Sequence, residues 1–227
     1  MIVEEKMKRA ELRYEIGECM HRCIDARNLS KKSQANLYLL ALHRRLLMND
    51  CCINDLKAQM QTVYTSDKAD VYINMIIINI AAICDNIAWA FKYEFDLFPD
   101  KTVDDVKFDV DIFNKKFRKE LKTIDENITP YWQKGPGFLQ KNAIFFGKWY
   151  SDFLEKLRHL SVHRIPLIVT RVEKNGKVEL QIMAANESLV FHDVQEIFDH
   201  HLKLNMLLKL LLNFYIENHS KSSVARC

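Results

Sequence analysis

The chain has 227 residues, of which 48% are hydrophobic and 28% charged, as in an ordinary globular protein. This composition excludes a disordered tail protein, a collagen-like fibre and a low-complexity scaffold. Only 5 glycines and 4 prolines are present, so we expect long helices with few corners, and the net charge of +3 permits a nucleic-acid partner without arguing for one.

Apolar residues recur at three- and four-residue spacing along most of the chain, which is the pattern of helices with one buried face. We therefore predict an all-α bundle of five to six helices in a single domain over residues 1–227. The expected helices run, in chain order, over about Ile2–Arg27, Leu37–Met60, Lys68–Phe95, Thr102–Ile124, Ala143–Arg164 and Asp193–His219. The third is apolar nearly all round, so it is expected at the centre of the bundle. Residues 127–142 contain two prolines and two glycines and are expected to form a loop.

One β feature precedes the last expected helix. Leu167–Thr170 and Val178–Ile182 are alternating segments rich in β-branched residues. Asn175 and Gly176 lie between them, and an Asn-Gly pair favours the tight turn of a hairpin. We expect a β-hairpin insert over about residues 166–184.

Cysteine usage and hydropathy indicate a cytoplasmic protein. The six cysteines lie in core-like helical contexts without the spacing of metal fingers, so we expect reduced thiols. The most apolar stretch, Val71–Cys84, is shorter than the roughly 20 residues that a membrane span needs. We therefore expect a core helix there and no contact with a membrane.

The stretch Arg158–Arg164 carries the most chemistry for its length. It gathers two imidazoles and two guanidiniums within seven residues, near the end of an expected helix that Pro166 stops. Imidazole transfers protons near neutral pH, and the guanidinium fork matches phosphate oxygens. Such groups cleave a phosphodiester without a metal when one moves a proton and another stabilises the developing charge. On a regular helix, Arg158 and His159 project away from the apolar stripe.

This arrangement resembles the motif of the HEPN family, in which an arginine, a polar residue, three more positions and a histidine occur near the end of a late helix. The resemblance implies a HEPN-like helical bundle and a metal-independent endoribonuclease, which leaves a 2′,3′-cyclic phosphate and a 5′-hydroxyl. It implies Arg158 and His163 as the catalytic pair, with His159 in the supporting polar position. Arg164 and Ser161 of the same stretch are expected to bind RNA.

The resemblance also implies partners. HEPN proteins commonly form homodimers in which the motifs of two subunits meet at the interface, and many serve in toxin–antitoxin or phage-defence systems. We therefore expect RNA as substrate, a homodimer, an antitoxin or defence-system protein as a further partner, and neither metal nor other cofactor. Ile165 stands where toxins controlled by a nucleotidyltransferase antitoxin tend to carry a tyrosine, which argues against control of that kind.

Several alternatives remain open from the sequence. The motif can instead belong to a non-catalytic module that binds nucleotide, RNA or protein, or it can be a solvated basic helix end. Asp85 and Asn86 lie in the most apolar helix, where they either form hydrogen bonds within the core or line the same cleft as Arg158. His192, Glu196 and His200 have helical spacing, but we expect no metal site without a third convincing ligand.

Overall fold

The computed structural model describes residues 10–18, 21, 34–59, 68–95, 150–154, 156–159, 167–174, 176–185 and 189–224. This part of the chain is mostly helical and carries one small antiparallel sheet, which confirms the predicted all-α class with a β insert. The helix expected over residues 102–124 and the loop expected over residues 127–142 lie outside the described residues.

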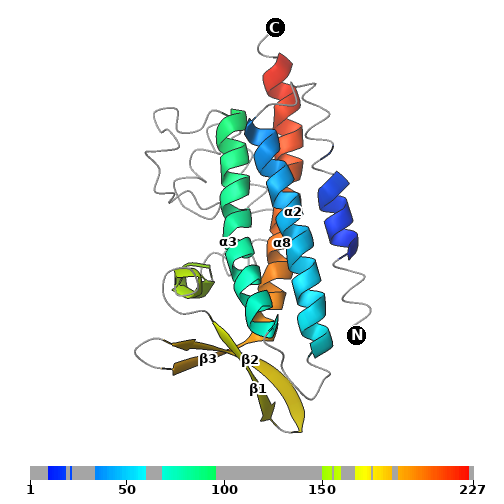
Figure 1. Ribbon diagram of the computed structural model, residues 1–227. Helices are drawn as coiled ribbons and strands as arrows, with labels where there is room; N and C mark the ends of the chain where they lie inside the picture. The colour runs from blue at the N-terminus through cyan, green and yellow to red at the C-terminus, as the bar shows by residue number, and fades with distance from the viewer. Residues whose placement is uncertain are drawn as a thin grey trace.

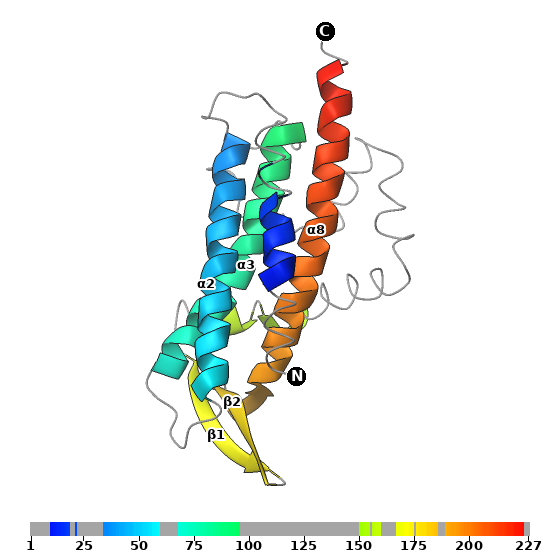
Figure 2. The same cartoon turned by 90° about the vertical axis from the view of Figure 1, so that its right-hand side faces the viewer.

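Three long helices run side by side (Figures 1 and 2). They are α2 (Gln34–Gln59), α3 (Lys68–Phe95) and α8 (Val194–Val224). The first two are antiparallel neighbours, and α8 lies against both. A helix over residues 10–18 lies beside α2 and α8, on the side away from α3 (Figures 1 and 2).

The core is centred on α3, as its uniformly apolar sequence predicts. Its buried side chains face α2, α8 and the first strand of the sheet. They include a run of isoleucines and one phenylalanine, namely Ile73, Ile76, Ile77, Ile80, Ile83, Ile87 and Phe91. Each such side chain contributes about 1.5–3 kcal/mol when it is fully removed from water.

This same helix meets the length and hydropathy criteria for a membrane span. Within the described ranges, α3 is the one helix that does so, and 61% of its most apolar window is buried inside the molecule. The core helix of a soluble protein passes the same test. The observed burial agrees with the core position predicted for this helix.

The sheet lies at the end of the bundle where α3 and α8 begin (Figure 1). Its antiparallel strands have the order β1 (Ile168–Lys174), β2 (Lys177–Ala185) and β3 (Leu189–Asp193). Lys174 pairs with Lys177, so a two-residue turn joins the first two strands, and Gly176 takes a φ of 71° that suits glycine. The predicted hairpin is thus present.

The third strand was not predicted, and it extends the insert beyond residue 184. β3 pairs with β2 in antiparallel register. It runs directly into α8, where Asp193 Oδ1 accepts a hydrogen bond of 2.8 Å from the backbone nitrogen of Gln195. This is an N-cap interaction. The five residues of β3 are too few for an alternating pattern to stand out in the sequence.

Candidate functional site

The described part of the Arg158–Arg164 motif follows an irregular helical segment beside α3 (Figure 1). Tyr150–Leu154 forms a π-helical turn, η1, and residues 156–159 form a short helical turn. A π-turn inserts a residue and rotates the side chains that follow it relative to a regular helix. Here Leu157 is buried, whereas Arg158 and His159 are exposed, as the expected helix geometry predicts.

Arg158 forms an ion pair with Asp85 of α3. Arg158 Nη2 lies 3.9 Å from Asp85 Oδ2, and the two side chains are 44% and 28% exposed. Of the alternatives for Asp85, the structure therefore favours the one that places it with Arg158. Asn86 is buried in the core, and its Nδ2 has no hydrogen-bond partner in the portion that the structure describes.

A second arginine acts on the same carboxylate. Arg45, on α2, donates a hydrogen bond of 2.8 Å from Nη1 to Asn79 Oδ1 on α3. Burial raises the pKa of Asp85, and the positive charges of Arg158 and Arg45 lower that pKa without cancelling the effect of burial. Asp85 is thus an acid with a raised pKa under the influence of two guanidiniums.

Arg45 was not predicted from the sequence. It lies on a different helix from Asp85, and its partner Asn79 is 34 positions away. No local spacing links these residues, because only the packing of α2 on α3 brings them together. A buried asparagine in an apolar helix was the one available signal that a polar partner must be near.

The remaining motif residues, Ser161, His163 and Arg164, lie outside the described residues. The described residues resume at Leu167, whose backbone forms hydrogen bonds with the side chain of Asn74 on α3. Asn74 Oδ1 accepts a hydrogen bond of 3.1 Å from Leu167 N, and Asn74 Nδ2 donates one of 2.9 Å to Leu167 O. In addition, Asp70 Oδ1 accepts a hydrogen bond of 2.6 Å from Val169 N.

The helix α3 therefore contacts the chain at the first residue of the motif and again just after the motif. Arg158 contacts Asp85, and Leu167 contacts Asn74. These two positions on α3 are about 16 Å apart at a rise of 1.5 Å per residue. Both contacts use polar side chains of a helix whose buried residues are mostly apolar.

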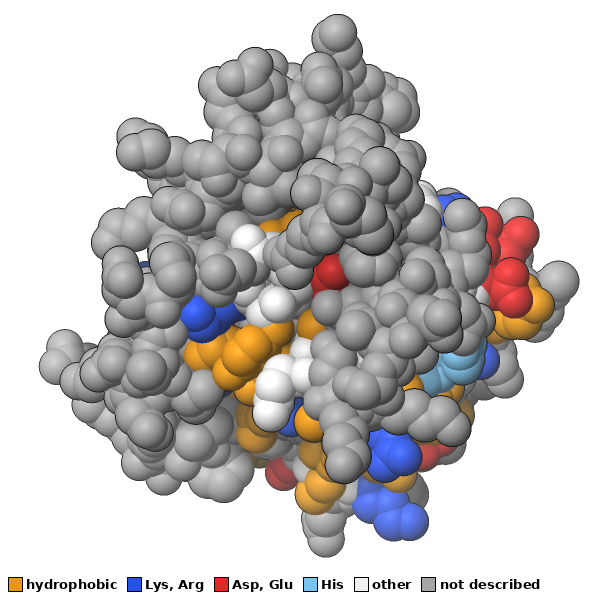
Figure 3. Space-filling view, turned by 90° about the horizontal axis from the view of Figure 1, so that it is seen from above, with side chains coloured by type: hydrophobic (Ala, Val, Ile, Leu, Met, Phe, Trp, Pro, Cys, Tyr) orange, Lys and Arg blue, Asp and Glu red, His pale blue; other side chains and the backbone are white. Residues whose placement is uncertain are grey.

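An aromatic cluster lies one helical turn from Asp85. The rings of Tyr38, Trp89 and Tyr93 stack, with centroids 5.6–5.8 Å apart. Burial raises the pKa of Tyr38. Asp85, Trp89 and Tyr93 follow one another at four-residue steps and so share one face of α3. At this end of the bundle, hydrophobic side chains reach the surface beside basic and acidic ones (Figure 3).

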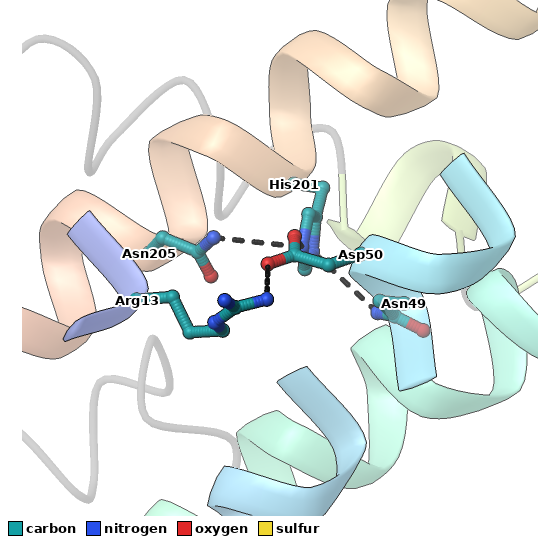
Figure 4. A network of polar contacts seen from close by, with 5 residues as sticks. All are labelled: Arg13, Asn49, Asp50, His201 and Asn205. Atoms are coloured by element: carbon teal, nitrogen blue, oxygen red, sulfur yellow. Dashed lines mark hydrogen bonds and ion pairs between the residues drawn. The ribbon is translucent and has the colours of Figure 1, made fainter. Parts of the chain in front are cut away.

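A second polar cluster is buried and fastens helices together (Figure 4). Arg13 Nη1 donates a hydrogen bond of 3.0 Å to Asp50 Oδ2, and Asp50 Oδ1 lies 3.9 Å from His201 Nε2. Asn49 and Asn205 each place Nδ2 3.5 Å from a ring nitrogen of His201. Because His201 is fully buried, this cluster joins the helix over residues 10–18 to α2 and α8 and is closed to a substrate.

Histidines are frequent at the start of α8. Among the described residues, no group of three or more His, Cys, Asp or Glu side chains could hold a metal ion. His200 Nδ1 lies 2.7 Å from the backbone oxygen of Glu196, and burial lowers the pKa of this histidine. Its ring is thus engaged with the backbone of its own helix.

Comparison of the chain with family models, with curated proteins and with solved structures finds no match. The function proposed below therefore rests on the geometry around Arg158.

Proposed function

We propose that the protein is a metal-independent RNA endonuclease of the HEPN type. The observation that supports this most is the placement of Arg158. Its guanidinium lies beside Asp85 of α3, while 44% of the side chain remains open to solvent. An accessible guanidinium can bind a phosphate oxygen through its planar fork of N–H donors.

The proposed reaction needs two groups. The 2′-hydroxyl of RNA loses its proton, and its oxygen attacks the adjacent phosphorus. The bond from phosphorus to the 5′-oxygen then breaks, and that oxygen takes up a proton. Arg158 stabilises the charge that develops on the phosphorus oxygens, and His163 moves one of the protons. His159 would support this pair, and Arg164 and Ser161 would bind the RNA.

The resemblance to the HEPN motif also implies an oligomeric state and a biological role, which we include in the proposal. The active form is a homodimer in which the motifs of two subunits meet, and the biological role is that of a toxin or a phage-defence enzyme in the cytoplasm. An antitoxin or defence-system protein would restrain it. Oligomeric state by light scattering tests the first of these points independently of activity.

The direct test of activity uses purified protein and total RNA in the presence of EDTA. We expect cleavage by the wild type, with products whose 5′ ends accept phosphate from a polynucleotide kinase without prior dephosphorylation. Arg158→Ala and His163→Ala should each lower the rate by about 10²- to 10⁴-fold, the usual loss for such groups. Arg44→Ala is the matched control, because it removes an exposed guanidinium from α2 away from the motif.

The outcomes separate the nuclease from a binding module. Intact RNA with the wild type, together with Arg158-dependent binding, would show a non-catalytic RNA-binding module. Cleavage that EDTA abolishes would contradict the metal-independent mechanism.

A further inference from the structure

Asp85 lies where two guanidiniums from separate parts of the chain act on one carboxylate. Arg158 Nη2 is 3.9 Å from Asp85 Oδ2, and the charge of Arg45 on α2 also reaches this group. A phosphate would present the same arrangement of oxygen acceptors to the two guanidiniums. The side chain of Asp85 is 28% exposed, so a solute can reach it.

Asn79 fixes the second guanidinium in place. Its Oδ1 accepts the hydrogen bond from Arg45 Nη1 at 2.8 Å, and only 3% of Asn79 is exposed. Within the described portion of the chain, the buried donors Arg45 Nε and Asn79 Nδ2 have no hydrogen-bond partner. Buried donors without acceptors leave positive potential uncompensated.

We propose that Asp85 occupies the place of an RNA phosphate, and that a substrate phosphate displaces it to bind Arg158. This inference rests on the proposed function. It adds Asp85 as an internal competitor of the substrate and Arg45 as a charge that attracts the phosphate from a longer distance.

The observed contact suits such an exchange. A separation of 3.9 Å exceeds the length of a hydrogen bond, so Asp85 and Arg158 attract each other by charge alone. Burial raises the pKa of Asp85 in spite of both arginines. Burial thus disfavours the charged form of Asp85, which favours its displacement from this position by a phosphate.

The test measures binding without cleavage. The probe is a fluorescein-labelled 2′-O-methyl oligoribonucleotide, which lacks the attacking hydroxyl, and the readout is fluorescence anisotropy at fixed salt. Asp85→Asn keeps the size of the side chain and removes the competing charge, so we expect about fivefold tighter binding, the effect of one half-exposed charge contact. Arg45→Ala and Arg158→Ala should each weaken binding by about the same factor.

Matched variants separate competition from a general charge effect. Asp152→Asn removes the same charge from an exposed position in η1, and Arg44→Ala removes the guanidinium next to Arg45 in sequence. Both should change affinity far less than their counterparts. Asp152→Asn tightening binding as much as Asp85→Asn would overturn the proposal. So would an undiminished effect of Asp85→Asn in an Arg158→Ala background.

Cleavage of unmodified RNA is measured separately, so the two proposals can fail independently. If the wild type cleaves no RNA but Asp85→Asn binds the probe more tightly than the wild type does, the anion site is supported and the nuclease function is refuted. If cleavage depends on Arg158 but Asp85→Asn and the wild type bind the probe equally well, the nuclease function is supported and this inference is overturned.

Discussion

Asp85 occupies a position at which ionisation is unfavourable. Burial raises its pKa more than Arg158 and Arg45 lower it, so the folded protein holds the proton more tightly than the unfolded chain does. The stability that this gives is fully present below the pKa of the unfolded carboxyl, and it is lost as the pH rises through the folded pKa. At neutral pH the wild type therefore bears the cost of a partly buried carboxylate.

Asp85→Asn removes that cost because an amide does not ionise. We predict a higher midpoint of thermal unfolding for Asp85→Asn than for the wild type at pH 7. The difference should shrink as the pH falls through the raised pKa of Asp85, below which this side chain is neutral in the wild type as well. A lower midpoint for the variant at pH 7 would show that the ion pair with Arg158 outweighs burial.

Asn74 joins α3 to the segment that follows the motif. It forms hydrogen bonds to both backbone groups of Leu167 and donates another, of 2.6 Å, to the backbone oxygen of Asp70. Asn74→Ala should cost about 2–3 kcal/mol at about 1 kcal/mol per hydrogen bond, which lowers the midpoint of thermal unfolding by about 5–10 °C. Val71→Ala, at an exposed site on the same helix, is the control. Equal midpoints for the two variants would contradict this account.

At the scale of elements, one partly buried ion pair and one exposed ion pair connect the helix over residues 10–18 to α2 and α8. Arg13 pairs with Asp50 on α2, whose side chain is only 6% exposed. Lys209 of α8 pairs with Glu15 at 2.6 Å, and these side chains are 36% and 41% exposed. The first pair is partly desolvated and touches the buried His201, whereas the second is largely open to water.

Removal of the two acidic partners should therefore have unequal effects. Asp50→Ala leaves Arg13 and His201 without a carboxylate and should cost about 3 kcal/mol of unfolding free energy in urea. Glu15→Ala breaks an exposed pair and should cost about 0.5 kcal/mol. A double-mutant cycle of Arg13→Ala with Asp50→Ala measures the coupling directly. Similar losses for Asp50→Ala and Glu15→Ala would refute the distinction between buried and exposed contacts.

Elements with strong local signals were predictable from the sequence. α3 has the predicted bounds, Lys68–Phe95, because apolar residues recur along its whole length. The hairpin followed from Asn175–Gly176, since that pair favours the observed turn. By contrast, the π-turn at Tyr150–Leu154 has no recognised local signature, and β3 is too short for an alternating pattern to stand out.

At the scale of the whole molecule, the contacts between distant segments were not predictable. Arg158 and His159 were identified by their spacing along the chain, and their exposure followed from helix geometry. Asp85 was left with two alternatives, and Arg45 was missed, because both depend on how α2, α3 and the motif pack together. The same holds for His201, whose partners Asn49 and Asp50 lie about 150 positions away.

The whole account depends on Arg158 acting on a phosphodiester of RNA. The most direct measurement is the single-turnover rate of RNA cleavage in EDTA for Arg158→Ala, divided by the rate for Arg44→Ala. The proposed mechanism predicts a ratio of about 10⁻² to 10⁻⁴, with equal midpoints of thermal unfolding for the two variants. Equal cleavage rates for the two variants would contradict it.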